Sequence, residues 1–128
     1  MIKFNENKAI YLQIADRICE DIIIGTYMEG GRIPSVREYA QLIEVSANTV
    51  ARSFDYLQSR GVVYNRRGVG LFVEENAVEA IKRMRKATFV AEELDSFMRQ
   101  AVLLDVTEAD LLAAYRRHLA ELKAHQAQ

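Results

Sequence analysis

The sequence predicts a mainly α-helical chain with one small β-hairpin, arranged as a helical head that ends in the hairpin and a helical tail. Apolar residues recur at helical spacing in three stretches before residue 61. Two short β-rich runs then flank a loop that contains two glycines, and helical spacing resumes after residue 76. Helix, turn, helix and hairpin in that order form a winged helix-turn-helix.

Length and composition restrict the class of protein. The chain has 128 residues, half of them apolar, which suits one compact domain or one domain with a small appendage. Its apolar runs are far shorter than the roughly 20 residues that a membrane-spanning helix needs, and its start lacks the order of a signal peptide. The single cysteine, Cys19, excludes an internal disulfide and fits a reducing compartment. We therefore expect a cytoplasmic protein that does not bind membranes.

Positive charge is concentrated between Arg32 and Gly70. This stretch holds six arginines and three acidic residues, a local net charge of +3 in a chain whose net charge is −1. A local basic surface attracts phosphate even when the whole protein is slightly acidic.

The first predicted helix runs from Ala9 to about Ile24, where Gly25 supplies a stop. Ser35 opens the second helix, because its hydroxyl can cap the first turn and Glu38, three residues later, completes a capping box. The segment of residues 44–46 is too short for anything but a sharp turn between the two helices.

The third predicted helix extends from Ala47 to about Arg60. At about 100° per residue its apolar side chains share one side, and a polar set without an acid falls opposite. That polar set consists of Asn48, Thr49, Arg52, Tyr56 and Ser59.

The runs Val62–Tyr64 and Leu71–Val73 should pair as the hairpin, with Arg66 and Arg67 projecting from its tip. We place the boundary between the winged helix-turn-helix domain, residues 1–75, and a helical tail, residues 76–128.

The tail shows two helical segments. The first runs to about Leu104 with a break near Thr88, and Thr107 with Asp110 signals the start of the second. These helices hold more apolar surface than a small winged domain needs, which favours a symmetric dimer over extra core for the head.

The polar start of the third helix suits DNA, because an α-helix fits the major groove and its N-terminal residues reach base edges. Ser46, Asn48 and Thr49 lie there, and Arg52 can bind guanine or a phosphate. Arg37 is placed to hold the DNA backbone, and the hairpin arginines can enter the minor groove. Singly, each can also be a solvated surface residue or a helix-start residue.

These motifs together resemble a known family. The runs Ile33–Glu38, Val45-Ser46, Asn48–Val50 and Arg66–Val73 are similar to the GntR family of bacterial transcription regulators, and the short tail is similar to its YtrA-like branch. Other branches of the family often carry arginine where this chain has Ala47 and Ala51, so their base-reading pattern is not transferred. The YtrA-like branch commonly has proline at the position of Ala47. The resemblance implies a two-helix dimerisation tail and DNA contacts at Arg37, Ser46, Asn48, Thr49, Arg52, Arg66, Arg67 and Gly68.

The sequence thus predicts a regulator, in our interpretation a repressor, that binds a palindromic operator in double-stranded DNA as a homodimer through residues 76–128. We expect no catalytic residues, metal ligands or cofactor. His118 and His125 have no third ligand at metal spacing.

Two other hypotheses stay open. One is a winged-helix module that binds proteins, although the polar face lacks the aromatic or aliphatic anchors of such a surface. The other is a sensor with a small-molecule effector in a pocket between the tail helices.

Overall fold

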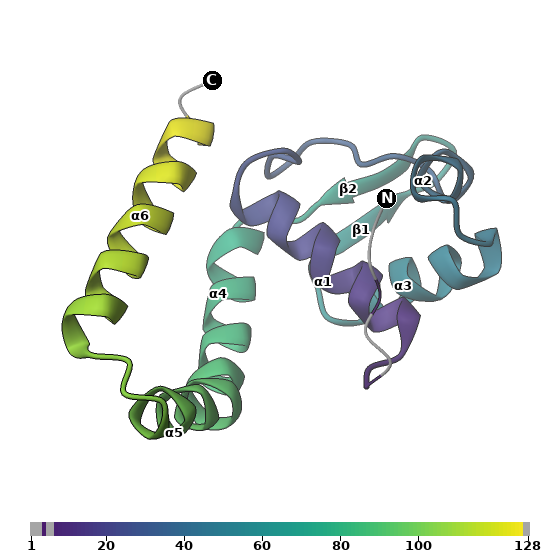
Figure 1. Ribbon diagram of the computed structural model, residues 1–128. Helices are drawn as coiled ribbons and strands as arrows, with labels where there is room; N and C mark the ends of the chain where they lie inside the picture. Colours follow the sequence, from purple (N-terminus) through teal and green to yellow (C-terminus); the bar gives the residue numbers. More distant parts are fainter. Residues whose placement is uncertain (1–3, 5–6, 127–128) are drawn as a thin grey trace. The chain divides into compact units, whose positions relative to one another are not determined.

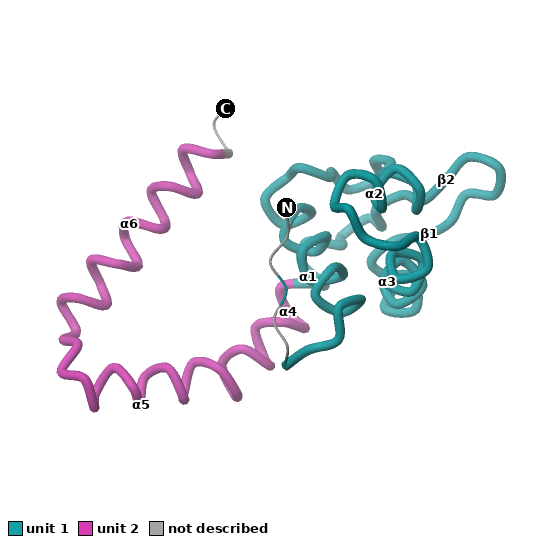
Figure 2. The backbone as a smooth tube through the Cα atoms, turned by 45° about the vertical axis from the view of Figure 1, so that its right-hand side comes forward, with its two compact units in different colours: residues 1–81 teal, residues 82–128 magenta. Residues whose placement is uncertain are grey.

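The computed structural model describes Phe4 and residues 7–126. The chain divides into two compact units, residues 1–81 and residues 82–128, which are coloured separately in Figure 2. The first unit contains α1 (Ile10–Ile23), α2 (Val36–Ile43), α3 (Ala47–Ser59), β1 (Val63–Arg66), β2 (Gly70–Val73) and the start of α4 (Ala77–Thr88). The second contains the rest of α4, the π-helical segment η1 (Phe89–Leu94), α5 (Asp95–Leu103) and α6 (Glu108–Gln126).

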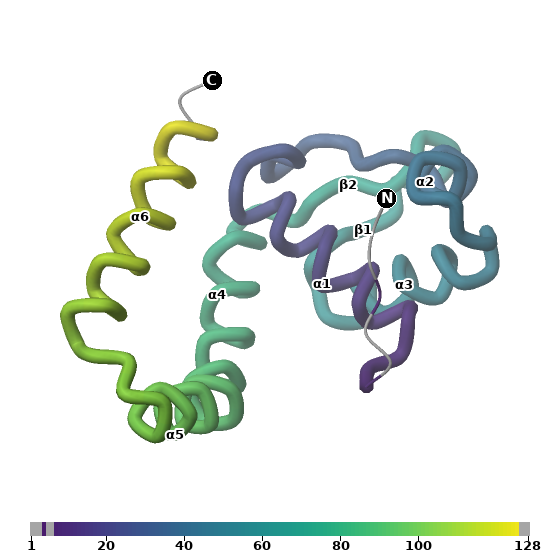
Figure 3. Tube along the Cα trace, viewed as in Figure 1, coloured from purple at the N-terminus to yellow at the C-terminus, as the bar shows by residue number. Residues whose placement is uncertain are grey.

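Helix α3 is the centre of the first unit. It contacts α1 on one side, α2 on another and strand β1 at its C-terminal end, as the tube in Figure 3 shows. The helical spacing of the sequence accounts for this packing, because the apolar side of each helix is buried. The largest buried side chains of this core are Tyr39, Phe54, Ile14, Ile18, Ile22, Ile33, Leu57 and Ile81.

The predicted capping box at the start of α2 is confirmed. The Ser35 backbone N–H donates to Oε1 of Glu38 at 2.9 Å, and the Glu38 N–H donates to Oγ of Ser35 at 3.1 Å. Helix α2 ends on Glu44, which has a left-handed backbone (φ 58°), and the N–H of Val45 returns to the carbonyl of Ala40. This left-handed residue sets the sharp turn between α2 and α3.

The hairpin is antiparallel, with Val63 opposite Val73 and Arg66 opposite Gly70 (Figure 1). Its strands are longer toward the tip than the sequence predicted, because the ladder continues to Arg66 and Gly70. Gly68 lies in the connecting loop with a φ of 78°, a conformation that glycine adopts without steric cost.

The beginning of α4 belongs to the first unit. Ala77 and Ile81 are buried in its core, and the N–H of Val78 donates to Oε2 of Glu29 at 3.0 Å. The division between the two compact units therefore follows Ile81.

In the second unit, the predicted break at Thr88 coincides with the end of α4 and the start of η1. The start of α6 has the reciprocal cap that the sequence predicted: Thr107 N–H to Asp110 Oδ2 and Asp110 N–H to Thr107 Oγ1, both 3.1 Å. Among the described residues, no helix is long and apolar enough to cross a membrane.

Candidate nucleic-acid interface

The first turn of α3 presents a polar surface to solvent. Ser46 is the N-cap residue, and its Oγ accepts a hydrogen bond from the Thr49 N–H at 3.3 Å. The hydroxyls of Ser46 and Thr49 lie 2.9 Å apart and are hydrogen-bonded. Asn48 is exposed beside them. The cap therefore fixes the turn while the Asn48 amide remains accessible.

The opposite side of α3 explains why this turn faces outward. Val50, Phe54 and Leu57 are buried, so the helix cannot rotate about its axis without exposing them. Ser53 is also buried, and its Oγ donates to the backbone carbonyl of Tyr11 at 2.7 Å, with the Thr49 carbonyl at 3.2 Å. This hydrogen bond joins α3 to the first turn of α1.

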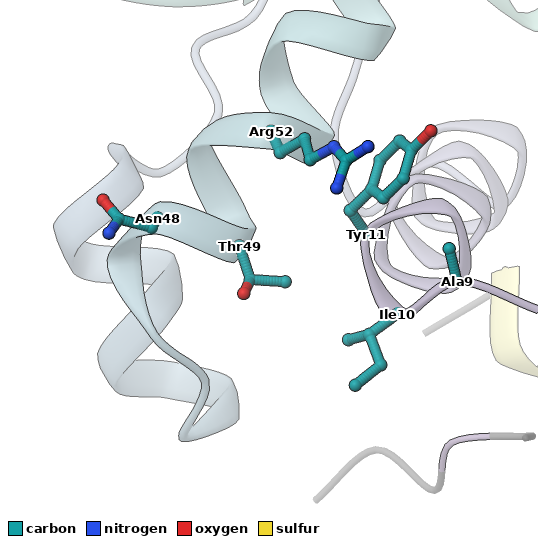
Figure 4. Close-up of a pocket in the computed structure, with 6 residues that line it drawn as sticks. All are labelled: Ala9, Ile10, Tyr11, Asn48, Thr49 and Arg52. Atoms are coloured by element: carbon teal, nitrogen blue, oxygen red, sulfur yellow. The ribbon is translucent and has the colours of Figure 1, made fainter.

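Arg52 and Tyr56, which the sequence grouped with the outward polar face, turn toward α1 instead. The Arg52 guanidinium carbon lies 4.1 Å from the centre of the Tyr11 ring. The Tyr56 ring meets Tyr11 edge-on at 6.2 Å between centroids. Figure 4 shows the Arg52 guanidinium beside the Tyr11 ring and the Asn48 amide pointing away from it.

A groove of about 350 Å³ separates the starts of the two helices. Its α1 wall is largely apolar and its α3 wall is polar, so an amphipathic surface adjoins the first turn of α3 (Figure 4). It is lined by Ala9, Ile10, Tyr11, Asn48, Thr49 and Arg52.

The basic residues of α2 and the hairpin are exposed. Arg37 lies in the first turn of α2, and Arg67 with Gly68 forms the tip of the hairpin. Arg66 is the last residue of β1 rather than part of the tip, and its guanidinium lies 5.0 Å from the centre of the Phe72 ring. The carbonyl of Arg66 accepts the Val69 N–H at 2.8 Å, so Arg66 closes the turn in which Arg67 lies.

Sequence reasoning missed two residues of this surface. Arg32 forms a β-bridge with Phe72, and its side chain crosses Gly70 so closely that a Cβ there would lie 2.9 Å from Nε. Arg32 also lies 4.0 Å from Glu38 at the start of α2. Tyr11 lies in the first predicted helix, outside the helix-turn-helix, and a sequence gives no signal that pairs it with Arg52.

The described part of the chain gives little support for metal binding or for catalysis. No three His, Cys, Asp or Glu side chains of that part lie close enough to hold a metal ion. Cys19 is buried in the core of the first unit. His118 lies on α6 with Nδ1 3.6 Å from Oε2 of Glu121.

A helix-turn-helix whose second helix begins on an exposed polar turn, followed by a hairpin with a basic tip, defines a winged-helix DNA-binding domain. The profile of the bacterial regulatory proteins of the gntR family matches residues 10–73, which span this whole domain. The chain belongs to the GntR family of transcription regulators.

The similarity to known proteins extends beyond the DNA-binding domain. The chain is 36% identical over 110 residues to the HTH-type transcriptional regulator YhcF of Bacillus subtilis (strain 168), covering 86% of this chain and 89% of YhcF. It is 33% identical over 92 residues to the transcriptional repressor YtrA of the same organism, covering 72% and 70%.

A solved structure agrees with this assignment. The crystal structure of a GntR-family transcriptional regulator from Bacteroides thetaiotaomicron matches with a TM-score of 0.63 and 50% identity, over 88% of this chain and 98% of that one. The winged helix-turn-helix and the YtrA-like resemblance predicted from sequence are confirmed.

Proposed function

We propose that this regulator binds a palindromic operator as a homodimer in the cytoplasm and represses the adjoining promoter. The observation that carries the proposal is the exposed first turn of α3, where Ser46, Asn48 and Thr49 present hydrogen-bonding groups at a helix N-terminus. Such a turn enters the major groove, where a side-chain amide recognises adenine through two hydrogen bonds.

The proposed roles follow from position in the first unit. Asn48 contacts a base edge, whereas Ser46 and Thr49 contact the sugar-phosphate backbone. Arg52, at the rim of the groove between α1 and α3, binds guanine or a phosphate. Basic residues on either side of the recognition turn hold the DNA backbone and the minor groove: Arg37, Arg66 and Arg67, with Gly68 allowing close approach of the hairpin tip.

Dimerisation through the tail is supported by exposed apolar side chains on its helices. On α6, Leu112, Tyr115, Leu119 and Leu122 are 49, 68, 41 and 40% exposed and follow one another at alternating spacings of three and four residues. This spacing is typical of a coiled-coil seam that a second helix covers. Large apolar side chains on α5 and the turn after it are exposed as well: Phe97, Met98, Val102, Leu103 and Leu104.

A symmetric pair of chains brings two recognition helices to one DNA molecule. Each helix reads only a few base pairs, and a two-fold axis places the half-sites about one helical turn, roughly 34–36 Å, apart. Selectivity of the regulator then depends on the tail as well as on α3.

Selection from a random duplex library tests the DNA-binding claim. We expect the wild-type protein, at physiological salt, to enrich a palindrome whose half-sites lie a whole number of helical turns apart. A reporter with the enriched site in its promoter should lose expression when the protein is present. A library without enrichment, or with a single asymmetric site, contradicts the proposal.

Sedimentation equilibrium tests the dimer. The paired change Leu112→Asp and Leu119→Asp should give a monomer, because it introduces charge into the seam. Met28→Asp, a change of an exposed apolar residue in the first unit, is the control and should stay dimeric; Met28 is 71% exposed, more than Leu112 at 49% or Leu119 at 41%. A wild-type chain that sediments as a monomer at micromolar concentration overturns the tail assignment.

A further inference from the structure

Tyr11 and Arg52 form the closest of three arginine–aromatic contacts in the described residues. The guanidinium carbon of Arg52 lies 4.1 Å from the ring centre, against 5.2 Å for Arg60 over Tyr56 and 5.0 Å for Arg66 over Phe72. A guanidinium within about 6 Å of an aromatic centre is attracted by the ring electrons. The contact therefore restricts the Arg52 side chain, although this side chain is exposed.

The Tyr11 ring is itself held in place. Its edge-on contact with Tyr56 fixes one side, with an angle of 76° between the rings. The Tyr11 carbonyl accepts the 2.7 Å hydrogen bond from Ser53, the residue next to Arg52 in α3. Ring and backbone of Tyr11 are thus both tied to the helix that carries Arg52, so the aromatic platform and the guanidinium belong to one rigid arrangement.

This arrangement borders the surface that we assign to DNA. Tyr11 and Arg52 line the same groove as Asn48 and Thr49 (Figure 4). A guanidinium that stacks through its planar face keeps its N–H edge available for two parallel hydrogen bonds. The stack leaves Arg52 ready to bind a phosphate or a guanine edge beside the base contacted by Asn48.

We propose that Tyr11, which belongs to α1 and not to the helix-turn-helix, is a positioning residue for DNA recognition: its ring holds the Arg52 guanidinium in the orientation that DNA binds. The inference rests on the proposed function and extends it. Without the ring, the Arg52 side chain rotates freely in the unbound protein and has to be ordered when DNA binds, which weakens the complex.

A double-mutant cycle on Tyr11 and Arg52 tests the inference, with the duplex enriched from the random library as the probe. Tyr11→Leu should weaken DNA binding about three- to tenfold. This range combines the loss of an exposed cation–π contact with the rotational freedom that the Arg52 side chain then has to lose on binding. Tyr11→Phe keeps an aromatic face and should bind within about twofold of wild type. In the Arg52→Ala background, Tyr11→Leu should have no further effect, because there is no guanidinium left to position.

Phe72→Leu is the matched control. It removes the aromatic partner of another arginine, Arg66 in the hairpin, and does not touch the Tyr11–Arg52 pair. Its effect should be the same with Arg52 or Ala at position 52. The Arg52 Nε–H resonance of the free protein should be shifted by the Tyr11 ring in wild type and Tyr11→Phe, and lose that shift in Tyr11→Leu.

The possible outcomes separate the inference from the function on which it rests. Independent effects of Tyr11→Leu and Arg52→Ala, with wild type binding the selected duplex, overturn the positioning role alone. An Arg52 resonance that is unchanged by Tyr11→Leu also overturns it. A wild-type protein that binds no duplex overturns the proposed function and the inference together.

Discussion

The change Ser53→Ala tests how the first unit holds its recognition helix. Ser53 is a fully buried polar residue, and its Oγ donates to the carbonyl of Tyr11 across 42 residues of sequence. Alanine removes this tertiary hydrogen bond and leaves the Tyr11 carbonyl with the bond it accepts within α1. No buried polar group is left without a partner, so the expected cost is that of the hydrogen bond itself.

The magnitude follows from two opposing terms. An intramolecular hydrogen bond contributes about 0.5–1.5 kcal/mol net, whereas Ala is a better helix former than Ser by about 0.5 kcal/mol. We therefore expect Ser53→Ala to lower the free energy of unfolding by up to about 1 kcal/mol. For a domain of this size that corresponds to a fall in Tm of up to about 8 °C.

Urea denaturation followed by near-ultraviolet circular dichroism measures this effect. Five of the six tyrosines lie in residues 1–81, so the signal reports mainly on the first unit. Ser59→Ala is the matched control: Ser59 is exposed, and its Oγ bonds only within α3, to the carbonyl of Tyr56. Both variants gain the same helix propensity, so their free energies of unfolding should differ by about 1 kcal/mol, the contribution of the tertiary hydrogen bond. Equal midpoints for both variants refute the reasoning.

Three further predictions concern caps, backbone and titration. Ser35→Ala should cost about 1 kcal/mol in urea unfolding. Because hydrogen bonds from Ser35, chiefly from its backbone N–H, lower the pKa of Glu38 below its ordinary 4.5, wild type should lose its advantage over Glu38→Gln as pH falls through that lowered pKa, and a pH-independent difference contradicts the account. Glu44→Gly should stabilise by about 0.5–1 kcal/mol in the same assay, since glycine adopts the left-handed backbone freely, and a less stable variant argues against strain at Glu44. Burial raises the pKa of Tyr39 from 10.0 to about 12, so stability should fall as pH rises from 10 to 12, and Tyr39→Phe should remove that part of the fall in pH-dependent unfolding.

Local signals in the sequence were sufficient for much of the fold. The capping box at Ser35 and the cap at Thr107 depend on residues three apart, so their spacing alone predicts both helix starts. The sequence predicted a break near Thr88, and the helical backbone changes there, from α4 to the π-helical η1, without being interrupted. The π-helical form was not predicted, because it consists in a change of hydrogen-bond partner along the backbone, which the spacing of apolar side chains does not report.

The contacts of the site residues could be identified only from the tertiary structure. The helical spacing of α3 correctly separates buried Phe54 from exposed Asn48, but it cannot say which neighbouring element lies beside the remaining face. Helix α1 occupies part of that side and turns Arg52 toward Tyr11, 41 positions earlier in the chain. The contact between Arg66 and Phe72 likewise depends on the register of the hairpin, which places Arg66 in the strand.

The central claim is that the first turn of α3 reads DNA sequence while the hairpin holds the DNA backbone. The most direct test is the ratio of affinities for the selected duplex and a random duplex, measured by fluorescence anisotropy at several salt concentrations. Asn48→Ala should lower this ratio about fivefold or more, whereas Arg67→Ala should weaken both complexes equally and reduce the salt slope by about 1. An unchanged ratio for Asn48→Ala would contradict the assignment of α3 as the reading helix.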